Sequence, residues 1–180
     1  MKTLKSARLI LRDWRIGDAG DFFEYAKSPN VGPNAGWKPH GSILESEKII
    51  GNFLESGDVW AIEHRELGKV IGSFGLHFDA TRKNPEARMI GYTLSEDFWG
   101  NGYMPEAVGL VLKHAFCELL LNIITVQHFP FNDRSRRVIE KCGFTYEGTL
   151  RRAVMIYNGN VYDSVSWSMT REEYLALNSD

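Results

Sequence analysis

Two glycines, Gly100 and Gly102, come immediately before a segment with helical periodicity. Glycine has no side chain to block the approach of a ligand to the backbone. The first N–H groups of a helix have no partner within it and lie at the positive end of the helix dipole. Such a turn can bind an anion, and a pyrophosphate would suit it. Two glycines before a helix also suit an ordinary tight turn, so this pattern alone leaves both interpretations open.

The glycine turn lacks the features of two common nucleotide-binding loops. It does not end in the Lys-Ser or Lys-Thr pair of a P-loop, and its spacing differs from the three-glycine G-x-G-x-x-G pattern of dinucleotide-binding folds. The sequence therefore disfavours both of these nucleotide-binding classes.

A second polar pair, Asn132 and Ser135, stands at the start of a later helical segment. At this spacing an amide and a hydroxyl can face a ligand that binds beside the helix. Asparagine is also a preferred N-cap residue, and a serine three positions later would then lie in the first helical turn. The two residue types fit a ligand-binding role and a capping role alike.

The hydrophobic pattern predicts the strands and helices that would position these residues. Strands are expected at residues 7–12, 59–63, 69–76, 87–94 and 123–127. Helices are expected at residues 17–28, 42–56, 105–119 and 133–142, and from residue 170 onward. The glycine turn then joins a strand to a helix. This order favours a mixed α/β sheet in a single domain, residues 1–180.

Turn and cap signals support these boundaries. The turn at residues 66–68 and the Asn158-Gly159 pair each predict a β-hairpin. Gly143 suits the C-terminal end of a helix, and Thr170 with Glu173 can form a capping box. Residues 30–41, with three glycines and two prolines, predict a long loop that covers a functional site or caps the core.

Composition narrows the class of protein. The chain has 180 residues, 43% hydrophobic and 24% charged, which is typical of one globular domain. A net charge of −2 without a run of Lys or Arg disfavours a nucleic-acid partner. Without an apolar stretch of about 18 residues, we expect no membrane span and a cytoplasmic location. The spacing of Cys and His predicts no metal site, and Cys117 and Cys142 are expected to be buried free thiols.

Taken in order, the motifs resemble the GNAT superfamily of N-acetyltransferases, and within it the branch of the ribosomal-protein N-terminal acetyltransferases. The matching segments are residues 90–94, the WGNGYMPEA run at 99–107, residues 132–135 and 140–144, together with residues 8–12 and the terminal hairpin. This resemblance covers nearly the whole chain. It implies a GNAT-like acyl-CoA N-acyltransferase fold, whose mostly antiparallel central sheet contains a splayed strand pair and is flanked by helices.

The resemblance also implies that acetyl-CoA is the acyl donor. Backbone amides of the glycine turn would hold its pyrophosphate, which assigns Trp99, Gly100, Asn101, Gly102, Tyr103 and Met104 to the cofactor site. The family pattern has a polar residue where Trp99 stands and a small one where Met104 stands, so Met104 is expected to narrow the cradle.

The strand before the glycine turn would hold the pantetheine arm. Main-chain groups of Tyr92, Thr93 and Leu94 would pair with the arm like an added strand, and Asn132 and Ser135 would contact it from the later helix. Gly91 is expected to mark a β-bulge where the strands splay, although it also suits an ordinary strand position.

Acetyl transfer from a thioester to an amine needs a polarised carbonyl, a proton for the departing thiolate and a neutral attacking nitrogen. A backbone N–H near Thr93 or Leu94 is expected to polarise the carbonyl. Many superfamily members protonate the thiolate with a tyrosine where this chain has Ile139. The resemblance therefore assigns that role to Ser135, oriented by Asn132. The candidate bases are Glu55, Glu63 and His77, of which Glu55 is preferred.

The resemblance favours a protein N-terminal α-amine as acceptor. The alternatives are a small-molecule amine such as a polyamine or aminoglycoside, or a non-catalytic acetyl-CoA-binding module. An α-amine has a pKa of about 7.7–8.0 against about 10.4 for lysine, so it needs less help from a base. The sequence is compatible with a monomer or a homodimer.

Overall fold

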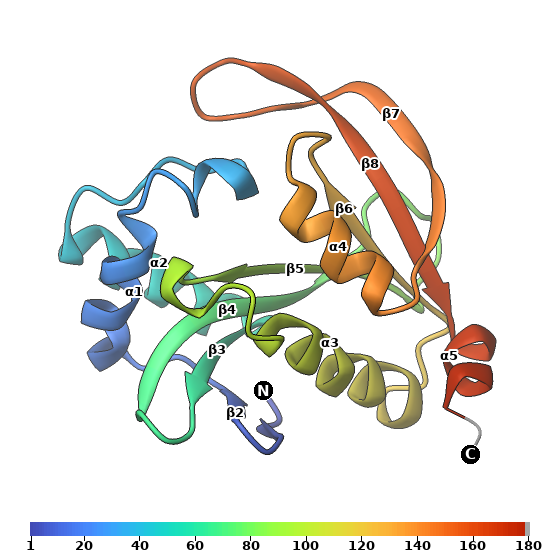
Figure 1. Ribbon diagram of the computed structural model, residues 1–180, viewed down its shortest axis with the longest axis horizontal. Coiled ribbons are helices and arrows are strands. Elements are labelled where there is room, and N and C mark those ends of the chain that lie inside the picture. Colours follow the sequence, from blue (N-terminus) through green and yellow to red (C-terminus); the bar gives the residue numbers. More distant parts are fainter. Residues whose placement is uncertain (179–180) are drawn as a thin grey trace.

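One eight-stranded sheet runs through the molecule in the order β1-β2-β3-β4-β5-β6-β8-β7, in a computed structural model that describes residues 1–178 (Figure 1). The strands are β1 Leu4–Lys5, β2 Leu9–Arg12, β3 Val59–His64, β4 Lys69–Phe78, β5 Ala87–Leu94, β6 Ile123–His128, β7 Thr145–Met155 and β8 Val161–Thr170. Neighbouring strands are antiparallel except β5 and β6, which are parallel. The predicted mixed, mostly antiparallel sheet is therefore confirmed.

Five α-helices accompany the sheet in the described residues. They are α1 Ala19–Ala26, α2 Ile43–Ser56, α3 Tyr103–Lys113, α4 Asp133–Lys141 and α5 Arg171–Leu177. Ser42 caps α2, with its hydroxyl accepting a hydrogen bond from the Glu45 amide, and α5 begins with the predicted capping box. Helix α3 begins at Tyr103, two residues before the expected start, because the left-handed Gly102 already serves as its N-cap.

Helices cover both faces of the sheet (Figure 1). Helices α1 and α2 enclose one hydrophobic core, which includes Phe22, Tyr25 and Ile50. Helices α3 and α4 cover the other face, where Val108, Val111 and Ile139 pack against the strands. These side chains are almost completely buried, and each contributes about 1.5–3 kcal/mol of transfer free energy. The two cores hold the sheet rigidly between the helical layers.

The sheet opens between β5 and β6. These strands pair only from Ala87 opposite Ile123 to Ile90 opposite Val126, so the last four residues of β5 extend beyond the pairing. The predicted splayed strand pair is thereby confirmed. The expected bulge at Gly91 is wrong, because Gly91 lies opposite Gly75 in an unbroken β4–β5 register. Divergence of β6, and not an extra residue in β5, opens the sheet.

Other expectations need correction. The two-residue strand β1 was not predicted, since so short an element leaves no periodic pattern. Both cysteines are free, but Cys117 is exposed and Cys142 half-buried. Cys117 lies in a π-helical turn after α3, where Ala115 and Phe116 occupy the buried side and leave Cys117 outward.

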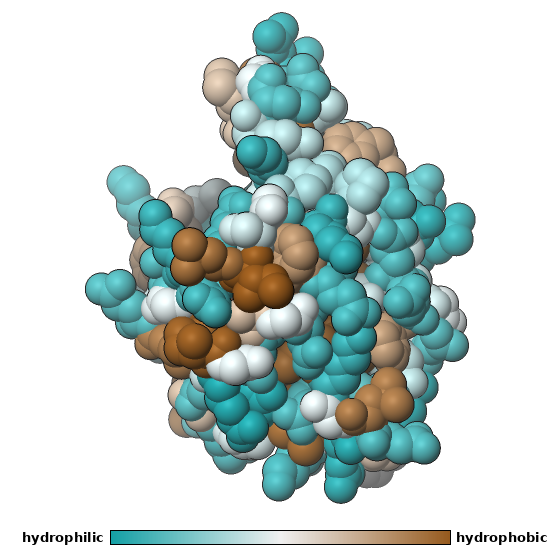
Figure 2. Space-filling view, turned by 90° about the vertical axis from the view of Figure 1, so that its left-hand side faces the viewer, coloured by the Kyte–Doolittle hydropathy of each residue, from teal (hydrophilic) through white to brown (hydrophobic). Residues whose placement is uncertain are grey.

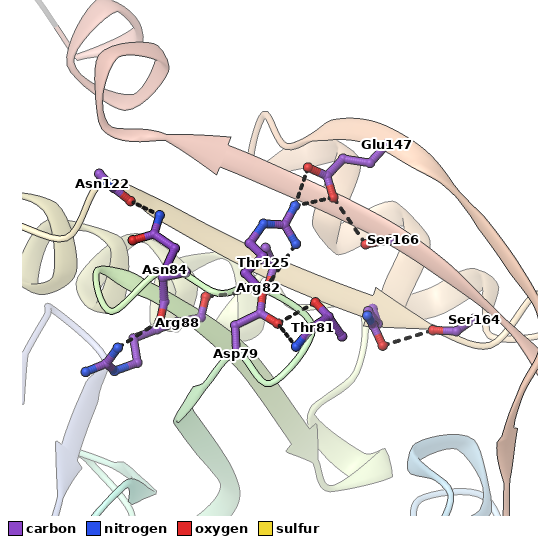
Figure 3. A network of polar contacts seen from close by, with 12 residues as sticks. Asp79, Thr81, Arg82, Asn84, Arg88, Asn122, Thr125, Glu147, Ser164 and Ser166 are labelled. Atoms are coloured by element: carbon purple, nitrogen blue, oxygen red, sulfur yellow. Dashed lines mark hydrogen bonds and ion pairs between the residues drawn. The ribbon is translucent and has the colours of Figure 1, made fainter.

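A buried polar network joins the β4–β5 connection to the second half of the sheet (Figure 3). The Asp79 carboxylate, 1% exposed, accepts hydrogen bonds from the Thr81 amide at 2.9 Å and the Thr125 hydroxyl at 2.7 Å. Arg82 lies 3.3 Å from Asp79 and reaches Glu147 on β7 at 2.6 Å. The network therefore links β4, β6 and β7 on the side of the sheet away from α4.

The β7–β8 hairpin projects from the rest of the molecule, and its tip stands out in the surface view (Figure 2). That view, of the side that carries α1 and α2, shows hydrophobic side chains in small groups among hydrophilic ones. The exposed hydrophobic side chains of α2 are Ile43, Leu44 and Leu54. Within residues 1–178 no helix combines the length and the apolar character needed to cross a membrane.

Candidate active site

A cavity of about 590 Å³ lies where β5 and β6 diverge. Its walls come from the ends of both strands, the glycine turn, α4, the loop after α1 and the β7–β8 hairpin. They include Asn30, Asn34, Tyr92, Leu94, Trp99, Gly100, Gly102, Tyr103, Met104, His128, Asn132, Arg134, Ser135, Arg137 and Lys141. Most of the predicted cofactor residues are therefore brought together around one space.

The β-ladder determines which main-chain groups of β5 face this cavity. On the β6 side, the Asn122 amide donates to the Glu86 carbonyl; on the β4 side, the Ser95 amide donates to the Ile71 carbonyl at 2.7 Å. Because strand residues alternate in direction, main-chain groups of Tyr92 and Leu94 point to the open side. The Leu94 carbonyl accepts from the Trp99 indole at 2.9 Å, which leaves the Leu94 N–H directed to the cavity.

The same alternation turns the main chain of Thr93 toward β4, so the expected pantetheine contact from its main chain does not fit the register. Its hydroxyl instead lies 2.8 Å from that of Ser73 on the α1 side of the sheet. Thr93 also lines the cavity, but of the three β5 residues expected to hold the arm, Tyr92 and Leu94 are the two whose main-chain groups are directed to it.

The glycine turn has the geometry of an anion cradle. Gly100 and Gly102 have φ values of 79° and 77°, in the left-handed region that favours glycine. Helix α3 starts next, and the Glu106 amide donates to the Gly102 carbonyl. Since Pro105 has no N–H, the amides of Gly102, Tyr103 and Met104 are the ones without a partner inside the helix.

Arg8, from the N-terminal strand region, holds the outer side of this turn. Its guanidinium forms a 2.6 Å ion pair with Glu106 and donates to the Asn101 carbonyl at 2.9 Å. It also lies 4.3 Å from the centre of the Tyr103 ring. Asn101 is therefore held on the outside and is not among the residues that line the cavity, contrary to its expected contact with the cofactor.

The two departures from the family pattern have different structural roles. Met104 is 5% exposed and belongs to the core beneath α3, so its side chain is accommodated in the interior. Trp99 packs against both cores, and the guanidinium of Arg134 lies 4.3 Å from the centre of its ring. This cation–π contact links the glycine turn to α4 across the cavity.

The cavity wall carries a row of positive charge. Arg134, Arg137 and Lys141 lie three and four residues apart on α4, which places them along one face of the helix. All three are exposed and line the cavity. They are its charged lining residues within the described part of the chain, so the cavity attracts anions. Sequence reasoning overlooked this row, although its helical spacing is readable.

Asn132 and Ser135 lie at the N-terminus of α4, as predicted. The Asn132 side-chain oxygen accepts from the Ser135 amide at 3.1 Å, which confirms the capping role for Asn132. The Ser135 hydroxyl points instead to Tyr92, with 3.1 Å between Oγ and Oη. Burial raises the pKa of Tyr92, so this phenol is neutral and can exchange hydrogen bonds with Ser135.

The three candidate bases lie elsewhere, since none of them lines the cavity. Glu55 is exposed near the end of α2. Glu63 forms a 2.5 Å ion pair with Arg12, and His77 Nδ1 lies 2.5 Å from Asp58. The partners of Glu63 and His77 satisfy them structurally, and the structure brings none of the three to the predicted cofactor residues.

The loop at residues 30–41 contributes to the cavity wall through its first half. Asn132 Nδ2 donates to the Asn34 carbonyl at 3.0 Å, and Asn30 Nδ2 donates to Glu96 at 2.9 Å. Hydrogen bonds from Ser28 and Asn30 hold the pKa of Glu96 below its usual range. Val31 and Trp37 of the same loop pack in the core of α1 and α2, so the structure supports both predicted roles, the cover over a site and the cap on the core.

Comparison with known proteins identifies the family. The sequence profile of the Acetyltransferase (GNAT) domain matches residues 8–145. A protein of Bacillus subtilis (strain 168), named as the uncharacterized N-acetyltransferase YoaA, is 31% identical over 173 residues, which are 93% of this chain and 96% of that protein. The chain belongs to the GNAT acetyltransferases and is an N-acetyltransferase.

Solved structures show the same fold. The ribosomal-protein-S5-alanine acetyltransferase of Vibrio fischeri superposes with a TM-score of 0.75 at 20% identity, covering 97% of this chain and 99% of that one. The microcin C7 self-immunity acetyltransferase MccE, solved with acetyl-CoA and AMP, gives a TM-score of 0.77 at 19% identity, covering 92% and 93%. At these identities the likeness concerns the fold.

Proposed function

We propose that this enzyme transfers the acetyl group of acetyl-CoA to the α-amino group of a protein N-terminus. The observation that carries this proposal is the cavity between β5 and β6, where free backbone amides, a positively charged row and two hydroxyl groups face one space. The relative MccE, whose structure contains acetyl-CoA, supports the choice of donor. The name of the Vibrio fischeri protein supports an N-terminal acceptor.

The lining of the cavity fits the parts of acetyl-CoA. Amides of Gly102, Tyr103 and Met104 suit the pyrophosphate, and the positive side chains of α4 suit phosphate groups. The open main-chain groups of Tyr92 and Leu94 suit the amides of the pantetheine arm. Acetyl-CoA would supply the thioester carbonyl at which the amine attacks.

Two groups of the chain would assist the transfer. The Leu94 N–H can donate to the thioester oxygen as negative charge develops there. The Ser135 hydroxyl can donate to the sulfur as the C–S bond breaks, with Tyr92 fixing its orientation at 3.1 Å. Asn132 holds the start of α4 and, through Asn34, the loop beside it.

Protonation favours an α-amine over a polyamine or an aminoglycoside. The described residues that line the cavity include no carboxylate to hold an acceptor with several positive charges, since Arg134, Arg137 and Lys141 are assigned to the phosphate groups of the cofactor. An α-amine is partly neutral near physiological pH, because its pKa is about 7.7–8.0. An N-terminal amine therefore needs only modest assistance in losing its proton.

The test is thiol release from acetyl-CoA by the purified chain with matched acceptors. We expect release with peptides that begin with a free alanine or serine, and none with the same peptides blocked at the N-terminus but containing an internal lysine. Spermidine and kanamycin serve as cationic small-molecule acceptors. Release with these amines but not with the free peptides would contradict the proposed acceptor.

Gly102→Val tests the cofactor cradle separately. A branched side chain at φ 77° strains the turn, so we expect acetyl-CoA to bind roughly 10-fold more weakly in calorimetry. Gly159→Val is the matched control, since Gly159 has a φ of 82° in the distant β7–β8 turn, with nothing within 4 Å of an added Cβ. Equal acetyl-CoA affinity in both variants would remove the phosphate role from the glycine turn.

A further inference from the structure

His128 is the last residue of β6, lines the cavity and is 7% exposed. Its Nδ1 lies 2.8 Å from the Phe129 carbonyl oxygen. A carbonyl oxygen only accepts hydrogen bonds, so Nδ1 must carry the proton in this contact. In the neutral ring Nε2 is then an acceptor with a free lone pair.

No hydrogen-bond partner within residues 1–178 reaches His128 Nε2, although the atom is buried. Buried polar atoms are nearly always paired, so an exception in a cavity wall calls for an explanation, such as a bound water molecule or a catalytic role. Here the unpaired atom is a proton acceptor, whereas the charged residues that line the cavity carry positive charge. Of His128, Glu55, Glu63 and His77, only His128 lines the cavity.

Register places His128 on the same face of the sheet as the two hydroxyl groups. The last β5–β6 pair joins Ile90 to Val126, so two further residues along each strand bring Tyr92 and His128 to corresponding positions where the strands diverge. Side chains two residues apart share a sheet face. Val126 and Ile90 pack in the core beneath α3 and α4, and therefore His128 and Tyr92 lie on that face, as does Ser135.

We propose that His128 Nε2 accepts the proton of the attacking amine, which makes His128 a catalytic base of the proposed acetyl transfer. The nitrogen lone pair forms the C–N bond while an N–H proton passes to Nε2. The C–S bond then breaks with its electron pair on sulfur. The imidazolium returns the proton to that sulfur, directly or through the Ser135 hydroxyl, so amide and free thiol are the products and the ring is neutral again.

A structural role for His128 makes a different prediction. Trp167 Nε1, on β8, is likewise buried without a partner in the described chain, and its ring lies 6.3 Å from that of His128. A water molecule between the indole N–H and Nε2 would satisfy both atoms. In that case, replacing His128 and replacing Trp167 would change kcat to a similar extent.

The test compares His128→Gln with Trp167→Phe, using acetyl-CoA and the free N-terminal peptides described above. Glutamine keeps a polar side chain but cannot take up the proton, so we expect kcat to fall by about 100-fold or more with unchanged acetyl-CoA affinity in calorimetry. Trp167→Phe should keep kcat within a few-fold of the wild type. A near-normal kcat in His128→Gln, or equal losses in both variants, would overturn the base role.

Nitrogen-15 NMR of the imidazole in the wild-type chain gives a readout independent of turnover, with His128→Gln identifying the signals. We expect protonated Nδ1 and unprotonated Nε2, and a change at Nε2 when coenzyme A and the acceptor peptide are added together. A proton on Nε2 in the neutral ring would overturn the inference. The inference depends on the proposed function, but the two fail differently: a wild-type enzyme inactive with every amine contradicts the function, whereas an active His128→Gln contradicts the base alone.

Discussion

At the residue scale, Asn132 and Ser135 have different structural roles at the start of α4. Asn132 caps α4 with its side chain, and Ser135 takes part in that cap only through its main-chain N–H. The Ser135 hydroxyl is directed to Tyr92 instead. The helix start and the candidate proton donor can therefore be separated experimentally.

Ser135→Ala should lower kcat by about 100-fold and leave acetyl-CoA affinity nearly unchanged. The alanine N–H still donates to Asn132, so α4 keeps its start, while the sulfur loses its hydrogen-bond donor. Steady-state kinetics and calorimetry on the same preparation measure the two effects. Tyr92→Phe removes only the orienting phenol and should have a smaller effect on kcat. An unaltered kcat in Ser135→Ala would leave the serine without a role in proton transfer.

The sequence correctly predicted the position of residues whose structural partners are close by in the chain. Asn132 and Ser135 are three residues apart, so helix geometry fixes their relation. Glu63 was a candidate base until the fold brought it to Arg12, 51 residues away in the chain. The direction of the Thr93 main chain depends on the register of β5 against β4, because a shift of one residue in register reverses the direction of every main-chain group along the strand. Contacts between residues that are far apart in the chain cannot be predicted from the local sequence pattern.

At the element scale, the loop at residues 30–41 is held against the cavity by polar contacts near its start and by close packing at Gly36. Gly36 has a φ of 89°, and a Cβ at this position would lie 3.3 Å from the Phe129 ring. Phe129 follows His128 directly and also lines the cavity. Packing of the loop is thus coupled to the end of β6.

Gly36→Ala should loosen this loop. Alanine at a left-handed position has a backbone strain of roughly 1–2 kcal/mol. In addition, its methyl group would crowd the Phe129 ring. We expect faster hydrogen exchange at residues 30–36 and a several-fold higher KM for acetyl-CoA. Gly57→Ala is the control, because Gly57 has a φ of 63° at the end of α2 with open space around it. Identical exchange of the loop in both variants would argue against the packing role.

The bounds of helices and strands with strong periodicity and caps could be predicted from the sequence. The arrangement of these elements relative to one another could not. The bounds of β5 match the prediction, and α2, expected at residues 42–56, runs from Ile43 to Ser56 after the Ser42 cap. The splayed pair followed only from the family resemblance. It depends on how β6 diverges after Val126, and nothing within β5 itself specifies this.

At the scale of the whole molecule, the Asp79 network connects the two halves of the sheet on either side of the opening (Figure 3). Burial alone would raise the pKa of Asp79, but the hydrogen bonds from Thr81 and Thr125 and the charge of Arg82 outweigh it and hold the pKa below its usual value. A carboxylate whose pKa is lowered by folding stabilises the folded state in its ionised form.

Asp79→Asn should therefore destabilise the fold in a pH-dependent way. Above the unfolded-state pKa of about 3.9 the wild type has the full contribution of the ionised carboxylate, and the variant should lose about 1–3 kcal/mol of unfolding free energy. As the pH falls through the lowered folded-state pKa, the wild type loses this contribution and the two proteins converge. Urea unfolding at a series of pH values measures the difference. Asp133→Asn, at an exposed carboxylate on α4, should show little change. A difference between the wild type and Asp79→Asn that stays constant with pH would mean that packing, and not the charge of Asp79, joins the two halves of the sheet.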